Sequence, residues 1–180
     1  MIEKSDYKGK MMGMEYTPDD SALAEMGKVT IRHSFLDWTL NRTIKTMTDM
    51  TPVQADFAFA SEPSASLRRK VIRVAKHCFG KESETFKRVD DLMKRCESVT
   101  KQRNRYTHNL WLSVEGRAVL LELAEQDRHM APPTARELEL LADTIRELYA
   151  EINAARMKGG GFIHEAVHKL RAEKRLASQS

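Results

Sequence analysis

Apolar residues return every three or four positions along several long stretches of this sequence, and this spacing constrains the fold more than any other feature. In the clearest stretch, Thr134 and Glu137 have the spacing of a helix capping box just after two prolines. A regular apolar stripe follows and predicts a helix: Leu138, Leu141, Ile145, Leu148, Ile152 and Ala155. Helices of this kind bury one side each in a shared core.

A second long helix is expected near the start of the chain. Thr17 is the predicted N-cap, Pro18 suits the first helical position, and the pattern continues to about residue 47. Its stripe consists of Ala22, Met26, Val29, His33, Leu36, Leu40, Ile44 and Met47. Ile31, Phe35 and Trp38 widen the apolar face, which predicts burial on two sides, against the core and against a second copy.

Two further helices are predicted in the middle of the chain. One runs from about Ser64 to Phe79 and stops at Gly80, after a short helical turn and loop over residues 51–63. The other is capped by Ser83 and runs to about His108. Its stripe consists of Leu92, Cys96, Val99, Arg103, Tyr106 and Leu110. Arg103 therefore stands at a position where the spacing predicts an apolar core residue.

The remaining segments are less regular. Apolar and other residues alternate over 110–114, Glu115-Gly116 suits a tight turn, and the apolar run 118–123 can return as a second strand, which predicts a small β-hairpin. Residues 118–126 fit a short helix as well. We expect a flexible arm over residues 1–16, a helical domain over 17–157, and a basic tail over 158–180 that forms a mobile helix after three glycines. The fold class is therefore mainly all-α with a possible hairpin.

Composition narrows the class of protein. No apolar run approaches the roughly 18 residues of a membrane helix, and no signal-peptide pattern opens the chain, so we expect a cytoplasmic protein without membrane contact. Cys78 and Cys96 are too few for a disulfide framework and are expected as reduced thiols. Residues 67–105 carry 13 basic and five acidic side chains, a charge bias that can attract a polyanion.

Metal and cofactor chemistry has little support. His164-Glu165-Ala-Val-His168 matches the H-E-x-x-H zinc pattern, but it lies in the basic tail with no evident third ligand. We interpret it as a solvated helix face. The sequence has no glycine-rich phosphate loop, no G-x-S-x-G motif and no C-x-x-C pair, and we expect neither a metal nor a cofactor.

The strongest chemical candidates stand at the end of the basic helix. Arg103, Asn104 and His108 fall within six residues, and Asn104 and His108 are spaced to share a helix face. A guanidinium binds phosphate oxygens, an imidazole transfers protons near neutral pH, and an amide orients either group. Because RNA carries its own nucleophile, the 2′-hydroxyl, these residue types suffice for cleavage without a metal.

The string Arg103-Asn104-x-x-x-His108, late in an all-helical domain, resembles the R-x(4–6)-H motif of the HEPN superfamily. The resemblance implies a bundle of four or five helices, a homodimer whose motifs face a shared cleft, and metal-independent endoribonuclease activity in toxins, phage defence or RNA processing. It assigns Arg103 and His108 as the catalytic pair and Asn104 as the polar support. RNA and an antitoxin or regulatory protein are the implied partners.

Other side chains are candidates for RNA contact. Basic groups can follow the RNA backbone, and an aromatic ring can stack on an unpaired base. The candidates are Arg105, Lys101, Tyr106, Arg73 and Lys76, with Arg68, Arg69, Arg95 and Trp111 as further possibilities. The alternative function is a non-catalytic dimeric module that binds a nucleotide, RNA or protein, and a helix-end histidine beside a core-edge arginine is the purely structural interpretation.

Overall fold

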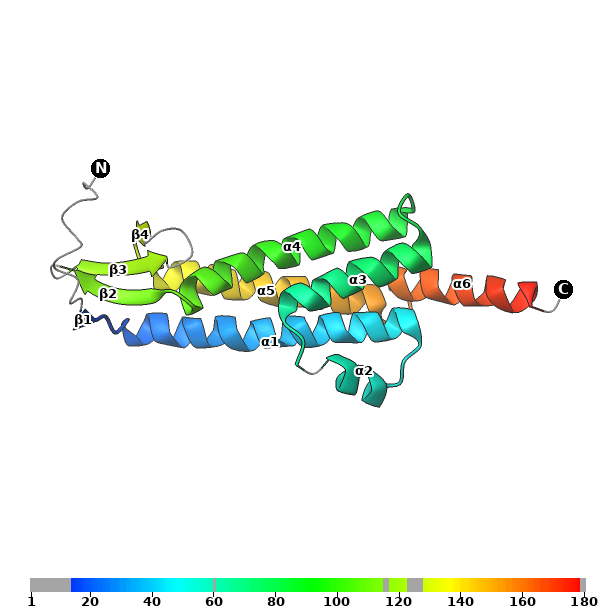
Figure 1. The fold of residues 1–180 in the computed structure, drawn as a ribbon, viewed down its shortest axis with the longest axis horizontal. Helices are drawn as coiled ribbons and strands as arrows, with labels where there is room; N and C mark the ends of the chain where they lie inside the picture. Colours follow the sequence, from blue (N-terminus) through cyan, green and yellow to red (C-terminus); the bar gives the residue numbers. More distant parts are fainter. Residues whose placement is uncertain (1–13, 60, 115–116, 123–127, 179–180) are drawn as a thin grey trace.

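Helices dominate the computed structural model, which describes residues 14–59, 61–114, 117–122 and 128–178. Figure 1 shows a long bundle with a small sheet at one end and the C-terminal helix at the other. The helices are α1 (Asp20–Thr48), α2 (Pro52–Phe59), α3 (Ser64–Phe79), α4 (Glu84–Thr107), α5 (Ala135–Arg156) and α6 (Phe162–Ala177). The strands are β1 (Met14–Glu15), β2 (Leu110–Val114), β3 (Arg117–Glu122) and β4 (Arg128–Met130). The prediction of a mainly α-helical fold with a small hairpin is confirmed.

Helix ends follow local chemistry. Thr134 and Glu137 form the predicted capping box of α5, and Ser83 caps α4 by accepting a hydrogen bond from the Phe86 N–H. The predicted cap of α1 is wrong by two residues. Asp19, rather than Thr17, accepts from the Ala22 N–H at 2.8 Å, because its carboxylate also suits the positive end of the helix dipole.

The core lies between α1, α3, α4 and α5. The α1 stripe contributes Val29, Leu36, Leu40 and Ile44, each 1% exposed or less, and α5 contributes its own predicted stripe in full. α1 and α5 lie side by side along most of their length (Figure 1). The outer face of α1 keeps Ile31, Phe35 and Trp38 about half exposed, at 60%, 54% and 48%.

The predicted hairpin is present and belongs to a larger sheet. β2 pairs antiparallel with β3, so the second segment is a strand and not the alternative helix. β1 joins the other edge of β2, with Met14 opposite Ser113, and β4 pairs with β3. The strand order is therefore β1-β2-β3-β4. The sheet continues directly from the C-terminal end of α4 (Figure 1).

The two segments predicted as an N-terminal arm and a C-terminal tail both contribute to the folded domain. The expected N-terminal arm lies mostly outside the described residues, but its last part forms β1. The expected C-terminal helix is present as α6, and its first turns bury Ile163 and Val167 in the main core. Among the described residues, no helix has the length and apolarity to cross a membrane.

Candidate functional site

Arg103 and His108 meet at the end of α4. The Arg103 Nη1 group donates a hydrogen bond to His108 Nε2 at 3.1 Å. A guanidinium has no acceptor, so His108 Nε2 offers its lone pair in this contact. His108 terminates α4, with its backbone N–H bonded to the Asn104 carbonyl, and its side chain is exposed to solvent.

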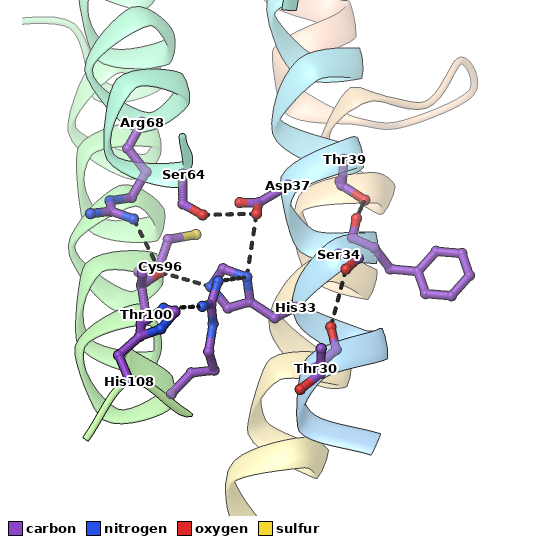
Figure 2. A network of polar contacts seen from close by, with 12 residues as sticks. Thr30, His33, Ser34, Asp37, Thr39, Ser64, Arg68, Cys96, Thr100 and His108 are labelled. Carbon is purple, nitrogen blue, oxygen red and sulfur yellow. Dashed lines mark hydrogen bonds and ion pairs between the residues drawn. The ribbon is translucent and has the colours of Figure 1, made fainter. Parts of the chain in front are cut away.

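A second imidazole holds the other side of the same guanidinium. Arg103 Nη2 donates to Nδ1 of His33 on α1 at 3.3 Å, across a sequence separation of 70 positions. Figure 2 shows His33 between α1 and α4, with Thr100 and His108 on the α4 side. No carboxylate of the described residues pairs with Arg103, and its Nε atom is buried without a hydrogen-bond partner there. The predicted arginine in the apolar stripe is therefore anchored by two imidazole nitrogens.

The His33 ring is almost completely buried, at 1% exposure. Its Nε2 atom lies 3.0 Å from the Thr100 hydroxyl oxygen. That hydroxyl gives its proton to the Cys96 carbonyl at 2.7 Å and accepts a hydrogen bond from Arg68 Nη1 at 3.1 Å. A hydroxyl has one donor and two acceptor lone pairs, so its remaining lone pair accepts from Nε2–H of His33.

Asp37 stands beside the same ring, one helical turn along α1. Its Oδ2 atom lies 3.3 Å from His33 Nδ1 and accepts a hydrogen bond from the Ser64 hydroxyl at 2.8 Å. The network thus joins α1, α3 and α4 through polar groups in an otherwise apolar core (Figure 2). Burial of Cys96 in this core raises the pKa of its thiol to about 12, so the thiol remains protonated.

Asn104, the predicted polar support, lies apart from this network. Its side chain is exposed, and no hydrogen bond joins it to Arg103 or His108 among the described residues. Its link to the pair is the backbone, since its carbonyl accepts from the His108 N–H at 3.0 Å.

The predicted RNA-contacting residues occupy different environments. Arg73 and Lys76 are exposed on α3, and Lys101 is exposed on α4 while pairing with Glu97 at 2.7 Å. Arg105 is directed to the sheet, where its Nε atom lies 3.4 Å from Oε1 of the buried Glu122.

The aromatic candidates also have structural contacts. Tyr106 is half-buried against the core, and burial raises the pKa of its hydroxyl, with the nearby Glu137 charge adding to the effect. Its backbone carbonyl accepts from the Trp111 indole at 2.9 Å, and the Trp111 ring stacks on Tyr16. Of the remaining basic candidates, Arg68 contacts Thr100 and Arg95 pairs with Glu151 on α5.

The H-E-x-x-H string lies on α6. The rings of His164 and His168 are 6.4 Å apart, centre to centre. Within the described parts of the chain, no group of three or more His, Cys, Asp or Glu side chains is arranged to hold a metal ion.

Sequence reasoning missed the residues that support the pair. The sequence places His33 in the apolar stripe of α1 and gives no sign that Ser64 and Thr100 lie near it. One signal was available, because His33 and Asp37 have the i, i+4 spacing that places both on one helix face. What the spacing does not reveal is that this face meets Arg103.

The chain matches no family model, no curated protein and no solved structure in the three comparisons made.

Proposed function

We propose that this protein is a metal-independent endoribonuclease whose reaction is carried out by Arg103 and His108. One observation carries the proposal: the Arg103 guanidinium is hydrogen-bonded to the buried His33 ring and to the exposed His108 ring, and to no described carboxylate. An arginine without a counter-ion at a partly open position suits an anionic ligand, and phosphate is the anion that its planar donors match best.

The chemistry follows from the roles open to the two side chains. An RNA phosphate that binds Arg103 competes with His108 for the guanidinium and frees Nε2. That nitrogen then removes the proton of the 2′-hydroxyl, whose oxygen attacks the adjacent phosphorus. The O2′–P bond forms and the P–O5′ bond breaks, while Arg103 stabilises the added negative charge. The proton that His108 has taken up passes to the leaving 5′-oxygen, directly or through water, which completes the 5′-hydroxyl and restores the neutral ring.

The surroundings are suited to a polyanion. Arg69, Arg73 and Lys76 are exposed on α3, at the spacing that places them along one side of the helix. Asn104 is exposed one residue from Arg103 and is free to contact the bound strand. These groups supply the non-specific attraction, and specificity for RNA over DNA comes from the 2′-hydroxyl that the reaction consumes.

The proposal includes a homodimer formed through the outer face of α1. Ile31, Phe35 and Trp38 are each about half exposed there, opposite the side of α1 that faces the core. Apolar side chains that gather on one exposed face favour a protein partner. A second copy would cover this face and remove its apolar side chains from water. Ile31→Glu is expected to convert the dimer to a monomer in light scattering coupled to gel filtration.

The decisive experiment is cleavage of end-labelled single-stranded RNA in EDTA. Wild type is expected to leave 2′,3′-cyclic phosphate ends, and His108→Ala is expected to lose about 10²- to 10⁴-fold in rate, the usual contribution of a general base. His77→Ala is the matched control, because His77 is an exposed histidine on α3 outside the network. A substrate with a single 2′-deoxy nucleotide should resist cleavage at that position.

Equal cleavage by wild type and His108→Ala would remove the mechanism. RNA binding without cleavage, in a protein of confirmed oligomeric state, would favour the non-catalytic binding module instead.

A further inference from the structure

Arg103 depends on a residue that lies far away in the sequence. A free arginine side chain has many rotamers and loses considerable entropy when it is fixed. Here its two Nη groups are bound on opposite sides, by His108 at 3.1 Å and by His33 at 3.3 Å. His108 is exposed and takes part in the proposed chemistry, so it cannot be the fixed anchor. His33 is buried and is the remaining support of the guanidinium among the described residues.

The His33 ring is itself oriented by its other nitrogen. Nε2–H donates to Thr100, whose hydroxyl is fixed by the Cys96 carbonyl and by Arg68. A neutral imidazole has one protonated nitrogen, so a proton on Nε2 leaves a lone pair on Nδ1. That lone pair is what Arg103 requires as an acceptor. The buried hydroxyl of Thr100 thus selects the tautomer that holds Arg103.

Nδ1 also faces a group that competes with Arg103. Asp37 Oδ2 lies 3.3 Å away and accepts only from an Nδ1 that carries a proton. The charged groups around the ring are Asp37 from α1, Arg68 from α3 and Arg103 from α4, while Ser64, Thr100 and the Cys96 thiol are neutral. The two neighbours therefore make opposite demands on Nδ1, because Arg103 binds its lone pair and Asp37 requires a proton there.

We propose that His33 is the positioning residue of this site, which holds the Arg103 guanidinium through the lone pair of Nδ1 while Thr100 fixes the tautomer. This inference rests on the proposed function for its consequence in catalysis, but not for its structural content. His33 does not contact the reacting atoms. It acts through Arg103, and its removal is expected to misplace the phosphate contact.

Two substitutions of His33 distinguish the role of Nδ1 from the role of Nε2. The amide of Asn places its polar atoms close to the position of Nδ1, whereas the amide of Gln reaches the position of Nε2. His33→Asn therefore keeps an acceptor for Arg103 and loses the Thr100 contact, and His33→Gln does the reverse. Both lose the imidazole ring from a buried position, and the smaller Asn also loses the Thr100 contact, so lower stability does not explain a defect that is confined to His33→Gln.

The first readout does not depend on catalysis. A guanidinium held at both Nη groups rotates slowly and gives resolved Arg103 side-chain N–H signals in ¹⁵N NMR, assigned with Arg103→Lys. We expect these signals in wild type and His33→Asn and their broadening in His33→Gln. Long-range ¹H–¹⁵N spectra of wild type should show the proton on Nε2 of His33. Retention of sharp Arg103 signals in His33→Gln, or a proton on Nδ1 in neutral wild type, would overturn the proposal.

The second readout is kinetic. His33→Gln is expected to lose about a hundredfold in kcat/KM, the scale of a misplaced contact of about 1 Å, and His33→Asn is expected to recover most of this loss. A purely structural role would make both variants equally poor. If wild type does not cleave RNA, the proposed function fails while the NMR result still decides the role of His33.

Discussion

Thr100→Val tests the buried network directly, because valine keeps the shape of threonine and removes only the hydroxyl. The Thr100 hydroxyl donates to the Cys96 carbonyl at 2.7 Å and accepts from His33 Nε2 at 3.0 Å and from Arg68 Nη1 at 3.1 Å. Arg68 is partly exposed and gains water in its place, and the Cys96 carbonyl keeps its helical hydrogen bond. The group left without a partner is Nε2–H of His33.

The magnitude follows from the burial of that ring. His33 is 1% exposed, so water cannot replace the lost acceptor. A buried donor left unsatisfied costs about 1–3 kcal/mol, and we expect the free energy of unfolding to fall by that amount. For a chain of this size, each kcal/mol lowers the melting temperature by about 2–4 °C. The assay is urea unfolding with linear extrapolation, accepted when the m-values of variant and wild type agree.

Thr43→Val is the matched control. Thr43 is fully buried on α1, and its hydroxyl donates to the Thr39 carbonyl of its own helix at 2.9 Å. Such a local bond contributes little to stability, so a change within about 0.5 kcal/mol is expected. Equal losses in Thr100→Val and Thr43→Val would refute the reasoning, since they would show that the His33 contact has no energetic weight.

Three further outcomes are expected. Thr134→Ala should cost about 1 kcal/mol through loss of the α5 capping box, with recovery in Thr134→Ser, as measured by thermal unfolding. Hydrogen bonds from the Thr134 backbone and hydroxyl lower the pKa of Glu137, so the stabilising effect of its ionised form holds at neutral pH and is lost as pH falls through the lowered pKa. The difference between wild type and Thr134→Ala should therefore shrink in acid, and a constant difference would contradict the cap. Thiol labelling of the native protein should modify the half-buried Cys78 well before the buried Cys96, whose pKa is about 12, as followed by mass spectrometry, and equal rates would be inconsistent with this burial. Leu36→Ala should lose about 2–5 kcal/mol in urea unfolding, because Leu36 has no exposed surface and leaves a cavity, and a loss below 1 kcal/mol would show that the core relaxes around it.

The sequence determined the secondary structure to a large extent because the signals that specify helices are local. The spacing of Thr134 and Glu137 predicts the start of α5, and Ser83 predicts the start of α4; the structure has both caps. The start of α1 is predicted at Thr17 and observed at Asp19, because both residue types are good helix caps and local sequence does not choose between them. The β2–β3 hairpin is also specified locally, because its two strands follow each other in the sequence. The pairing of β1 with β2 and of β4 with β3 cannot be predicted from the residue pattern of a single segment.

The sequence also brought Arg103 and His108 together, because they are five residues apart at the end of one helix. Only the tertiary structure decided what supports them. His33 is 67 positions from Thr100 and 70 from Arg103, and in the sequence it reads as one more member of an apolar stripe. Periodicity tells which side of α1 is buried, but not which neighbouring helix that side meets. The packing of α1 against α3 and α4 sets this, and it turns a buried histidine into the anchor of an arginine.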